Sequence, residues 1–335
     1  MGIRKDTHYN SWCTVKVLQK RGFMVNTGMN KKPFKKRLKK QLQENWILYV
    51  MILPVIVYFL IFEYYPMYGI TLAFKEYYPK EGILGSPWVG FKNFERLFRS
   101  YNFGTMIRNT LGISLYSLVV GFTLPIIFAL MLNYVKNEKL KKTVQTMSYA
   151  PHFISTVVIC GMISLFMAKD TGIFNVFREL MGLERVSFLS KPEWFKDIYV
   201  WSGVWQSMGW SAIIYISALA GVDPQMHEAA IIDGATKIQR MRYIDLPSIK
   251  GTIVMLLIMR MGNVMSVGFE KVYLLQNSLN YSESLIISTY VYEIGLLGGD
   301  YSFSTAVGLF NNIINIILLV AANWFSKKVL DESLF

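Results

Sequence analysis

The sequence Asp223-Pro-Gln-Met-His-Glu-Ala-Ala-Ile-Ile-Asp-Gly234 decides how the rest of this chain is interpreted. It lies between two long apolar segments and contains the start and stop signals of a short helix. Asp223 can accept hydrogen bonds from the first free backbone N–H groups, and the proline suits the first helical position because it has no N–H to leave unpaired. Gly234 readily adopts the left-handed conformation that ends a helix. The pattern predicts a helix from Pro224 to about Asp233.

A second short helix is expected directly after this glycine. Thr236 and Gln239 have the spacing of a capping box, in which each side chain bonds the backbone of the other residue. Pro247, in the sequence Ile244-Asp-Leu-Pro247, limits how far this helix can continue. The two short helices are therefore expected to form a compact projection between the apolar segments.

The composition indicates a membrane protein. Of the 335 residues, 53% are hydrophobic, which is above the range usual for soluble domains, and the mean hydropathy is +0.33. Six apolar segments have about the 20 residues that a helix needs to cross a bilayer. They are Trp46–Tyr65, Leu111–Tyr134, Met147–Ala168, Tyr199–Gly221, Thr252–Leu275 and Ser304–Phe325. The predicted fold class is an all-α integral membrane protein with six transmembrane helices.

The basic residues are distributed unevenly over the segments outside these spans. Residues 1–45 hold twelve, 136–142 four, 222–250 four and 327–328 two, together 22 of the 35 Lys and Arg. The opposite segments, 67–107, 169–198 and 276–303, hold five, five and none. Because Lys and Arg accumulate on the cytoplasmic side, both termini and segment 222–250 are predicted to be cytoplasmic. The net charge of +13 is thus explained by orientation in a membrane, and we expect no nucleic-acid partner.

The domain organisation follows from this pattern. Residues 1–45 lack the apolar core and cleavage site of a secretory signal and are interpreted as a basic cytoplasmic tail. Residues 46–325 form the membrane domain, which includes the cytoplasmic loop 222–250. Residues 326–335 are expected to be a short cytoplasmic tail.

The loop also carries a motif. Glu228-Ala229-Ala230 is followed after three residues by Gly234 and after nine more by Ile244-x-Leu246-Pro247. This pattern resembles the signature loop of the permease subunits of binding-protein-dependent ABC importers. The resemblance implies the type I ABC importer permease fold, with 222–250 as the coupling loop that contacts an ATPase. The alternative is a helical hairpin in which the glutamate and glycine are only capping residues.

Segments before the second span support a narrower resemblance. Tyr65-Pro66-Met-Tyr-Gly69, Gly82-Ile-Leu-Gly-Ser-Pro-Trp88 and the following Val-Gly-Phe-Lys-Asn93-Phe94 are similar to maltose-type carbohydrate permeases, in a subgroup linked to oligosaccharides and polysaccharide fragments. The resemblance implies a bacterial cell-membrane protein that forms half of a translocation path for an oligosaccharide. The implied partners are a second homologous permease, two ATPase subunits and an extracytoplasmic solute-binding protein. Outer segments 68–100, 172–182 and 283–296 either dock that protein or only cap the bundle.

The resemblance places ATP and Mg on the ATPase subunits, so this chain is not expected to be an enzyme or to hold a cofactor. No phosphate-binding loop of the Gly-x-x-x-x-Gly-Lys-Ser/Thr type occurs in the sequence. The resemblance assigns the ATPase contact to Glu228, Ala229, Ala230, Asp233, Gly234, Ile244, Leu246 and Pro247. Two cysteines in dissimilar surroundings and three histidines give no metal-binding pattern.

Polar side chains within the spans are candidates for the translocation path, because such groups are costly in a membrane unless they face a cavity or another helix. Aromatic faces beside hydroxyl and amide groups suit a sugar. Spacings of three and four residues place Asn263, Ser266 and Glu270 on one helical face. The candidates are Trp205, Gln206, Trp210, Ser211, Asn263, Ser266, Glu270, Tyr273, Asn311 and Asn315.

Other interpretations of these side chains remain open. Asn311, Asn312 and Asn315 also suit hydrogen bonds between helices, Glu270 and Lys271 suit a neutralised pair, and Arg260 suits an ion pair across a subunit boundary. The spans contain no cluster of basic residues that indicates an anionic substrate. A secondary transporter driven by an ion gradient is the alternative function, but the spans contain few acids and no clear internal repeat.

Overall fold

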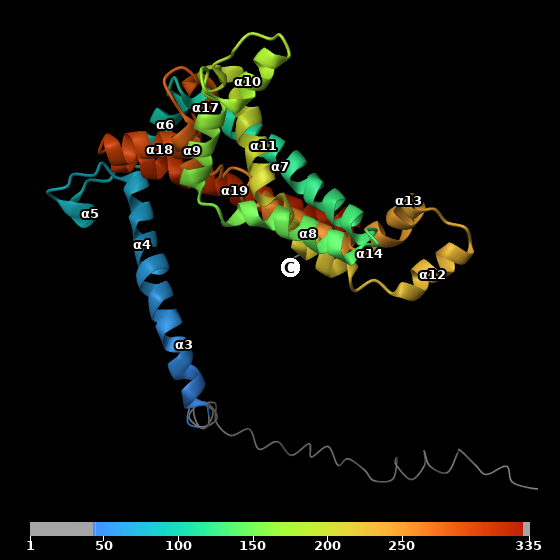
Figure 1. The fold of residues 1–335 in the computed structure, drawn as a ribbon. Coiled ribbons are helices and arrows are strands. Elements are labelled where there is room, and N and C mark those ends of the chain that lie inside the picture. The colour runs from blue at the N-terminus through green and yellow to red at the C-terminus, as the bar shows by residue number, and fades with distance from the viewer. Residues whose placement is uncertain (1–42, 44, 331–335) are drawn as a thin grey trace, which may run out of the picture. The chain divides into compact units, whose positions relative to one another are not determined.

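The computed structural model describes Gln43 and residues 45–330, which fall into two units divided between Met67 and Tyr68 (Figure 1). The predicted basic tail lies outside the described residues except for Gln43 and Asn45. The predicted C-terminal tail is described only as far as Leu330.

The described part of the first unit is one helix. It consists of α3 (Trp46–Phe59), the π-helical turn η1 (Leu60–Tyr64) and α4 (Tyr65–Met67). The helix is apolar nearly all the way round, and none of its described side chains is buried. A helix with this distribution is typical of a membrane span rather than of a soluble protein surface. The helix predicted over Trp46–Tyr65 is confirmed.

The described part of the second unit is helical. No strand occurs in it, although Lys75 and Trp88 form an isolated β-bridge. Its elements are η2 (Tyr68–Phe74), α5 (Gly82–Gly85), α6 (Lys92–Phe98), α7 (Phe103–Asn133), α8 (Glu138–Tyr149), η3 (Ala150–Phe153), α9 (Thr156–Phe166), α10 (Ile173–Leu180), η4 (Phe188–Ser190), η5 (Pro192–Trp194), α11 (Phe195–Leu219), α12 (Pro224–Ile232), α13 (Lys237–Arg240), η6 (Met241–Asp245), α14 (Leu246–Ser248), α15 (Lys250–Met261), α16 (Phe269–Leu275), α17 (Tyr281–Ser284), α18 (Ile287–Val291), η7 (Tyr292–Leu297) and α19 (Tyr301–Leu330).

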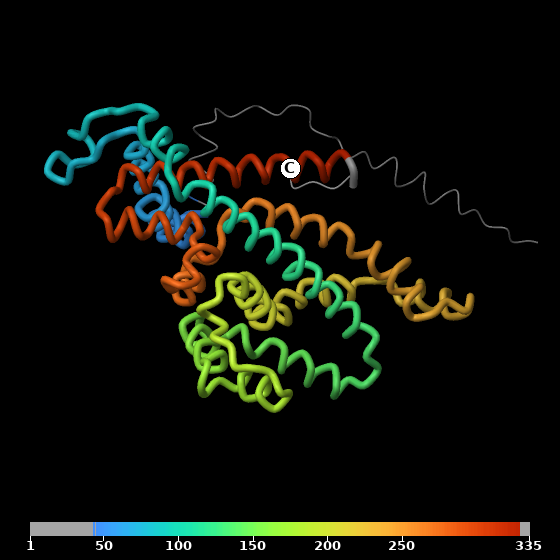
Figure 2. The backbone as a smooth tube through the Cα atoms, turned by 90° about the horizontal axis from the view of Figure 1, so that it is seen from above, coloured from blue at the N-terminus to red at the C-terminus, as the bar shows by residue number. Residues whose placement is uncertain are grey.

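Helices α7 and α11 form the most extensive helix–helix contact of this unit. Helix α8 and the turn η3 also pack on α11, while α15 packs on both α11 and α19. Figure 2 shows these helices running past one another, with the orange segment of α12 to α14 extending beyond them. The arrangement places the loop 222–250 at one end of the helices and the segments around α6, α10 and α17 at the other (Figure 1).

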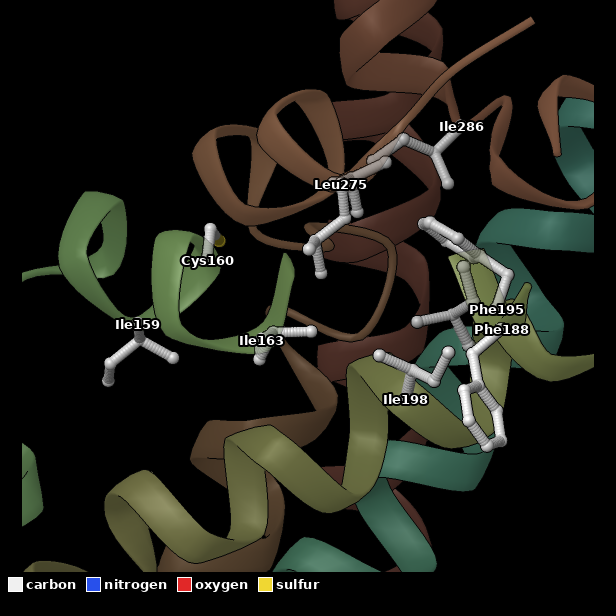
Figure 3. Close-up of a cluster of buried hydrophobic side chains, with 10 residues drawn as sticks. Ile159, Cys160, Ile163, Phe188, Phe195, Ile198, Leu275 and Ile286 are labelled. Atoms are coloured by element: carbon white, nitrogen blue, oxygen red, sulfur yellow. The ribbon is translucent and has the colours of Figure 1, made fainter. Parts of the chain in front are cut away.

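Three clusters of buried side chains hold the second unit together. The first joins α7, α9, α11 and α16 through Ile113, Cys160, Phe195 and Val272 (Figure 3). A second lies around α6, α18 and α19, and a third joins α7 and α11 nearer the loop, where Ile249 is buried. Because dense packing allows little relative movement, these clusters fix the helices that border the functional residues.

The predicted count of six spans is only partly matched. Three helices are long and apolar enough to cross a membrane: Trp46–Phe74, Phe103–Asn133 and Tyr301–Lys328. The predicted span Met147–Ala168 coincides with a helix pair bent by 100° between Phe153 and Thr156. The prediction of one continuous helix over Thr252–Leu275 is wrong, because α15 ends at Met261 and α16 begins only at Phe269. Two glycines, Gly262 and Gly268, flank this break.

The α8–α11 contact depends on a glycine. A Cβ atom on Gly209 of α11 would overlap the backbone carbonyl of Ser148 on α8. We expect Gly209→Ala to overpack this contact at a cost of about 1–3 kcal/mol and to lower the midpoint of thermal unfolding in detergent. The control is Gly161→Ala in α9, where a Cβ atom meets open space. An equal midpoint for the two variants would contradict this prediction.

Candidate functional site

The first helix of the loop 222–250 forms as its sequence predicts. The Asp223 carboxylate accepts a hydrogen bond from the Gln225 N–H at 2.9 Å. Pro224 occupies the first helical position of α12, and the helix ends at Ile232 with Asp233 as its C-cap. The predicted capping signals are therefore confirmed.

A glycine turn separates this helix from the next. Gly234 has a φ of +78°, and the Ala235 N–H donates to the Ala230 carbonyl at 2.8 Å, which closes the end of α12. Thr236 and Gln239 then form the predicted capping box at the start of α13. The chain continues through η6 and α14 directly into α15, so the loop is helical over most of its length.

The loop exposes apolar side chains. Exposed residues include Met226, Ile231, Ile232, Ile238 and Tyr243, with Ile232 exposed to 85%. Figure 1 shows α12 and α13 extending beyond one end of the long helices. A group of exposed apolar side chains on a projecting segment is typical of a protein–protein contact.

One buried carboxylate attaches the loop to the helices. The side chain of Asp245 in η6 is fully buried and accepts a hydrogen bond from the Tyr134 hydroxyl, at the end of α7, at 2.6 Å. His227 of α12 places Nε2 3.1 Å from the other carboxylate oxygen. The Arg240 guanidinium lies 5.4 Å from the centre of the Tyr134 ring. The sequence analysis did not identify this Asp245 cluster, whose only signal was an acid in the variable position of Ile-x-Leu-Pro.

A second polar region lies between the long helices. Three adjoining cavities of about 350, 280 and 380 Å³ are bordered by α7, α11, α15 and the segment 262–268. Arg260 lines all three, so we call them together the Arg260 groove. The predicted path residues that line the groove are Gln206, Trp210, Ser211, Asn263, Ser266 and Glu270.

The sequence predicted that Asn263, Ser266 and Glu270 share one face of a continuous helix, and the structure does not show this face. Asn263 and Ser266 lie in the irregular segment between α15 and α16, and only Glu270 is helical. Asn315 of α19 stabilises this segment, because its side chain accepts from the Met265 N–H at 2.9 Å and donates to Ser266 Oγ at 3.1 Å. The three side chains therefore reach the groove through a break in the helix, not through a shared face.

The remaining predicted path residues lie elsewhere. Trp205 lines a separate apolar cavity of about 430 Å³ with Trp194 and Trp201. Tyr273 stacks on Phe269 at 5.4 Å between ring centres. The buried Oδ1 atom of Asn311 has no hydrogen-bond partner among the described residues.

The end of the unit opposite the loop is rich in charge. A cavity of about 740 Å³ is lined by α6, by residues 299–303 and by Glu76. The pKa of Glu76 lies below its usual value. The main cause is the hydrogen bond that the Tyr78 hydroxyl donates, and the hydrogen bond and charge of Lys92 act in the same direction. Arg108 and Lys196 both pair with Glu283, at 2.6 and 2.7 Å. The two ion pairs join the first turns of α7 and α11 to α17.

The family is decided by comparison with known proteins. Residues 121–331, which include the loop and most of the residues that line the Arg260 groove, match the family described as binding-protein-dependent transport system inner membrane component. The chain belongs to this family. The resemblance inferred from the signature loop is thereby confirmed, and the protein is a membrane permease component of a binding-protein-dependent transport system.

Related permeases align over nearly their whole length. The permease is 43% identical to the polygalacturonan/rhamnogalacturonan transport system permease protein YteP of Bacillus subtilis (strain 168), over 93% of this chain and 97% of that protein. It is also 43% identical to the protein LplB of the same organism, over 88% and 92%.

The fold is shared with a solved transporter. A chain in the crystal structure of a bacterial ABC transporter involved in the import of the acidic polysaccharide alginate is 42% identical to the permease, with a TM-score of 0.82, and the match covers 88% of this chain and 99% of that one. A chain in the crystal structure of a bacterial alginate ABC transporter in complex with alginate pentasaccharide-bound periplasmic protein is 41% identical and gives a TM-score of 0.83. The predicted type I ABC permease fold agrees with this likeness.

We expect the Asp245 cluster to hold the loop of the permease in place. Asp245→Ala leaves the Tyr134 hydroxyl without its acceptor and removes the carboxylate beside His227. An unsatisfied buried polar group costs about 1–3 kcal/mol. Limited trypsin digestion in detergent should then cleave the loop faster at Lys237, Arg240 and Arg242. The control is Asp233→Ala, because the Asp233 side chain is exposed. Equal cleavage of the two variants would show that the cluster does not hold the loop.

Proposed function

We propose that this permease is the transmembrane subunit of an ATP-driven importer and forms half of the translocation path for an oligosaccharide. The support is its membership of a family of binding-protein-dependent transport components and its similarity to permeases named for polygalacturonan and arabinooligosaccharides. A transporter of known structure with the same fold is named for alginate, also a carbohydrate polymer. Polygalacturonan, arabinooligosaccharides and alginate belong to the names of those relatives, and we propose only the class of substrate for this chain.

The observation that carries the proposal is the construction of the loop 222–250. It presents Glu228, Ala229 and exposed apolar side chains on a rigid projection, and it is continuous with α11 at one end and α15 at the other. We propose that this projection is the coupling helix and that an ATPase subunit binds it. Closure of the ATPase pair on ATP then moves the projection, and the motion reaches α7 through Asp245 and Tyr134.

The remaining coupling residues shape the projection or leave room for the ATPase. Gly234 keeps the turn between α12 and α13 sharp, and Ala229 and Ala230 leave room for close approach of the partner. Ile244, Leu246 and Pro247 continue the helix from the projection toward α15. Asp233 caps the end of α12 beside the turn.

The proposed assembly contains a second homologous permease, two ATPase subunits that bind ATP and Mg, and an extracytoplasmic solute-binding protein. We propose six membrane crossings, formed by α3, α7, the bent pair α8–α9, α11, the broken pair α15–α16, and α19. Both termini and the loop are then cytoplasmic. The charged surface around α6, α17 and Glu283 is the proposed docking site for the solute-binding protein.

The coupling role is tested with Gly234→Arg. At a φ of +78° a side chain is strained, and an arginine there also obstructs the ATPase contact. We expect uptake to fall to background in vesicles supplied with ATP but no ion gradient, with normal amounts of the variant in the membrane. The matched control is Gly182→Arg, at the same left-handed position (φ +75°) after α10, which should retain copurification of the ATPase. Wild-type uptake by Gly234→Arg, or uptake that needs only an ion gradient, would reject the proposal.

The proposed orientation is tested by labelling from either side of the membrane. In a variant without Cys13 and Cys160, Ile232→Cys in the loop should react with an impermeant maleimide only from the cytoplasmic side. Leu180→Cys in α10 should react only from outside; both side chains are at least 77% exposed. Reaction of the two cysteines from the same side would contradict the proposed arrangement of spans.

A further inference from the structure

Arg260 stands at the junction of the Arg260 groove. Among the described residues it is the only one that lines all three cavities. It belongs to the last turn of α15, and its side chain is exposed in this subunit. One cavity extends to Trp210 and Ser211, and another extends to Glu270 and Lys271.

The two cations of the groove have different surroundings. Lys271 is buried, donates from Nζ to the Tyr199 carbonyl at 2.8 Å and lies 4.8 Å from the centre of the Tyr199 ring. Its ammonium is therefore already bound within the chain. Arg260 makes no ion pair or hydrogen bond with any residue that the structure describes. Glu270 is the single acid among the described residues that line the groove, and it forms no ion pair with Arg260.

An unpaired guanidinium within a membrane span is expensive, so such residues face a polar cavity and mark the path of a solute or ion. The groove offers hydroxyl and amide groups around Arg260, from Ser117 on α7, Ser207 on α11 and Asn263. The buried Oγ of Ser114, which lines the same cavity as Arg260, has no hydrogen-bond partner among the described residues. The groove thus contains both an unused cation and an unused hydroxyl.

We propose that Arg260 is a specificity-determining residue that binds the carboxylate of an acidic sugar as it passes through the groove. The inference rests on the proposed function and adds the class of substrate, an oligosaccharide containing uronic acid units. The guanidinium presents a planar pair of N–H donors that matches a carboxylate, while the surrounding hydroxyl and amide groups match sugar hydroxyls. Trp210, stacked on His152 at 4.5 Å, borders the adjoining cavity and supplies an aromatic surface for the sugar ring.

The experiment uses the assembled importer with its solute-binding protein in proteoliposomes supplied with ATP. The probes are trimers of galacturonate and of mannuronate, each compared with its neutral methyl ester, and maltotriose. Arg260→Gln removes the charge, Arg260→Lys keeps it without the planar fork, and Ser211→Ala is the control in the same groove. Assembly of the complex is followed by size-exclusion chromatography.

We expect Arg260→Gln to lower uptake of the uronate trimers about tenfold or more, because a charge-assisted bidentate pair is lost, and to leave uptake of the neutral probes unchanged. Arg260→Lys should be intermediate, and Ser211→Ala should affect acidic and neutral probes alike. The selective loss is not expected from a merely structural role, which would lower both classes.

Three results would overturn the inference. They are an unchanged ratio of acidic to neutral uptake in Arg260→Gln, uptake of only neutral probes by the wild type, and dissociation of the complex by Arg260→Gln. The last result would assign Arg260 to an ion pair with the second permease. If the wild-type complex contains no ATPase and takes up no probe of either class, the proposed function itself fails.

Discussion

The buried carboxylate of Asp245 is the constraint on which the position of the loop depends. A carboxylate removed from water is costly unless hydrogen-bond donors surround it. Here the Tyr134 hydroxyl, at the end of α7, donates to one carboxylate oxygen, and His227 of α12 places Nε2 3.1 Å from the other. The loop cannot move away from α7 without exposing or breaking these contacts. The Asp245 cluster therefore attaches the projection to the end of α7.

The same loop is covalently continuous with the helices that border the groove. Helix α11 enters the loop and α15 leaves it, and both contribute lining residues near Arg260. Asn315 adds α19 to this assembly by bonding Met265 and Ser266. A displacement of the loop therefore acts on the groove through two backbone connections and one side-chain cluster. In the mechanism that we propose, this connectivity couples an ATPase bound at the loop to the groove between the helices.

Local signals made the loop predictable from the sequence, whereas the groove depends on long-range packing. Asp223, Gly234 and the Thr236–Gln239 pair act within a few residues, so their capping roles could be recognised before any fold was known. Trp205 and Gln206 show the opposite case. An α-helix turns by about 100° per residue, and these neighbours consequently line different cavities.

The break between α15 and α16 was missed for a similar reason. Residues 262–268 contain no proline, and apolar residues continue through them, so the pattern favours an unbroken span. Only the fold shows that Asn315, 50 residues further on, accepts a hydrogen bond from the Met265 N–H in this break. The sequence also does not predict that three cavities meet at Arg260. Each of α7, α11 and segment 262–268 contributes only a few polar residues to their lining, and the fold brings these together.

The irregular segment and the unpaired charge occur at the same place, and this coincidence has a physical explanation. Backbone that is not helical is tolerated at membrane depth only where protein covers it or a polar cavity borders it. An unpaired guanidinium has the same requirement. Arg260 lies two residues before the irregular segment, and both line one cavity with Ser114 and Ser117. In the proposed arrangement of six spans a lipid-facing surface would satisfy neither feature, so this arrangement requires that this side of α15 border a polar interior.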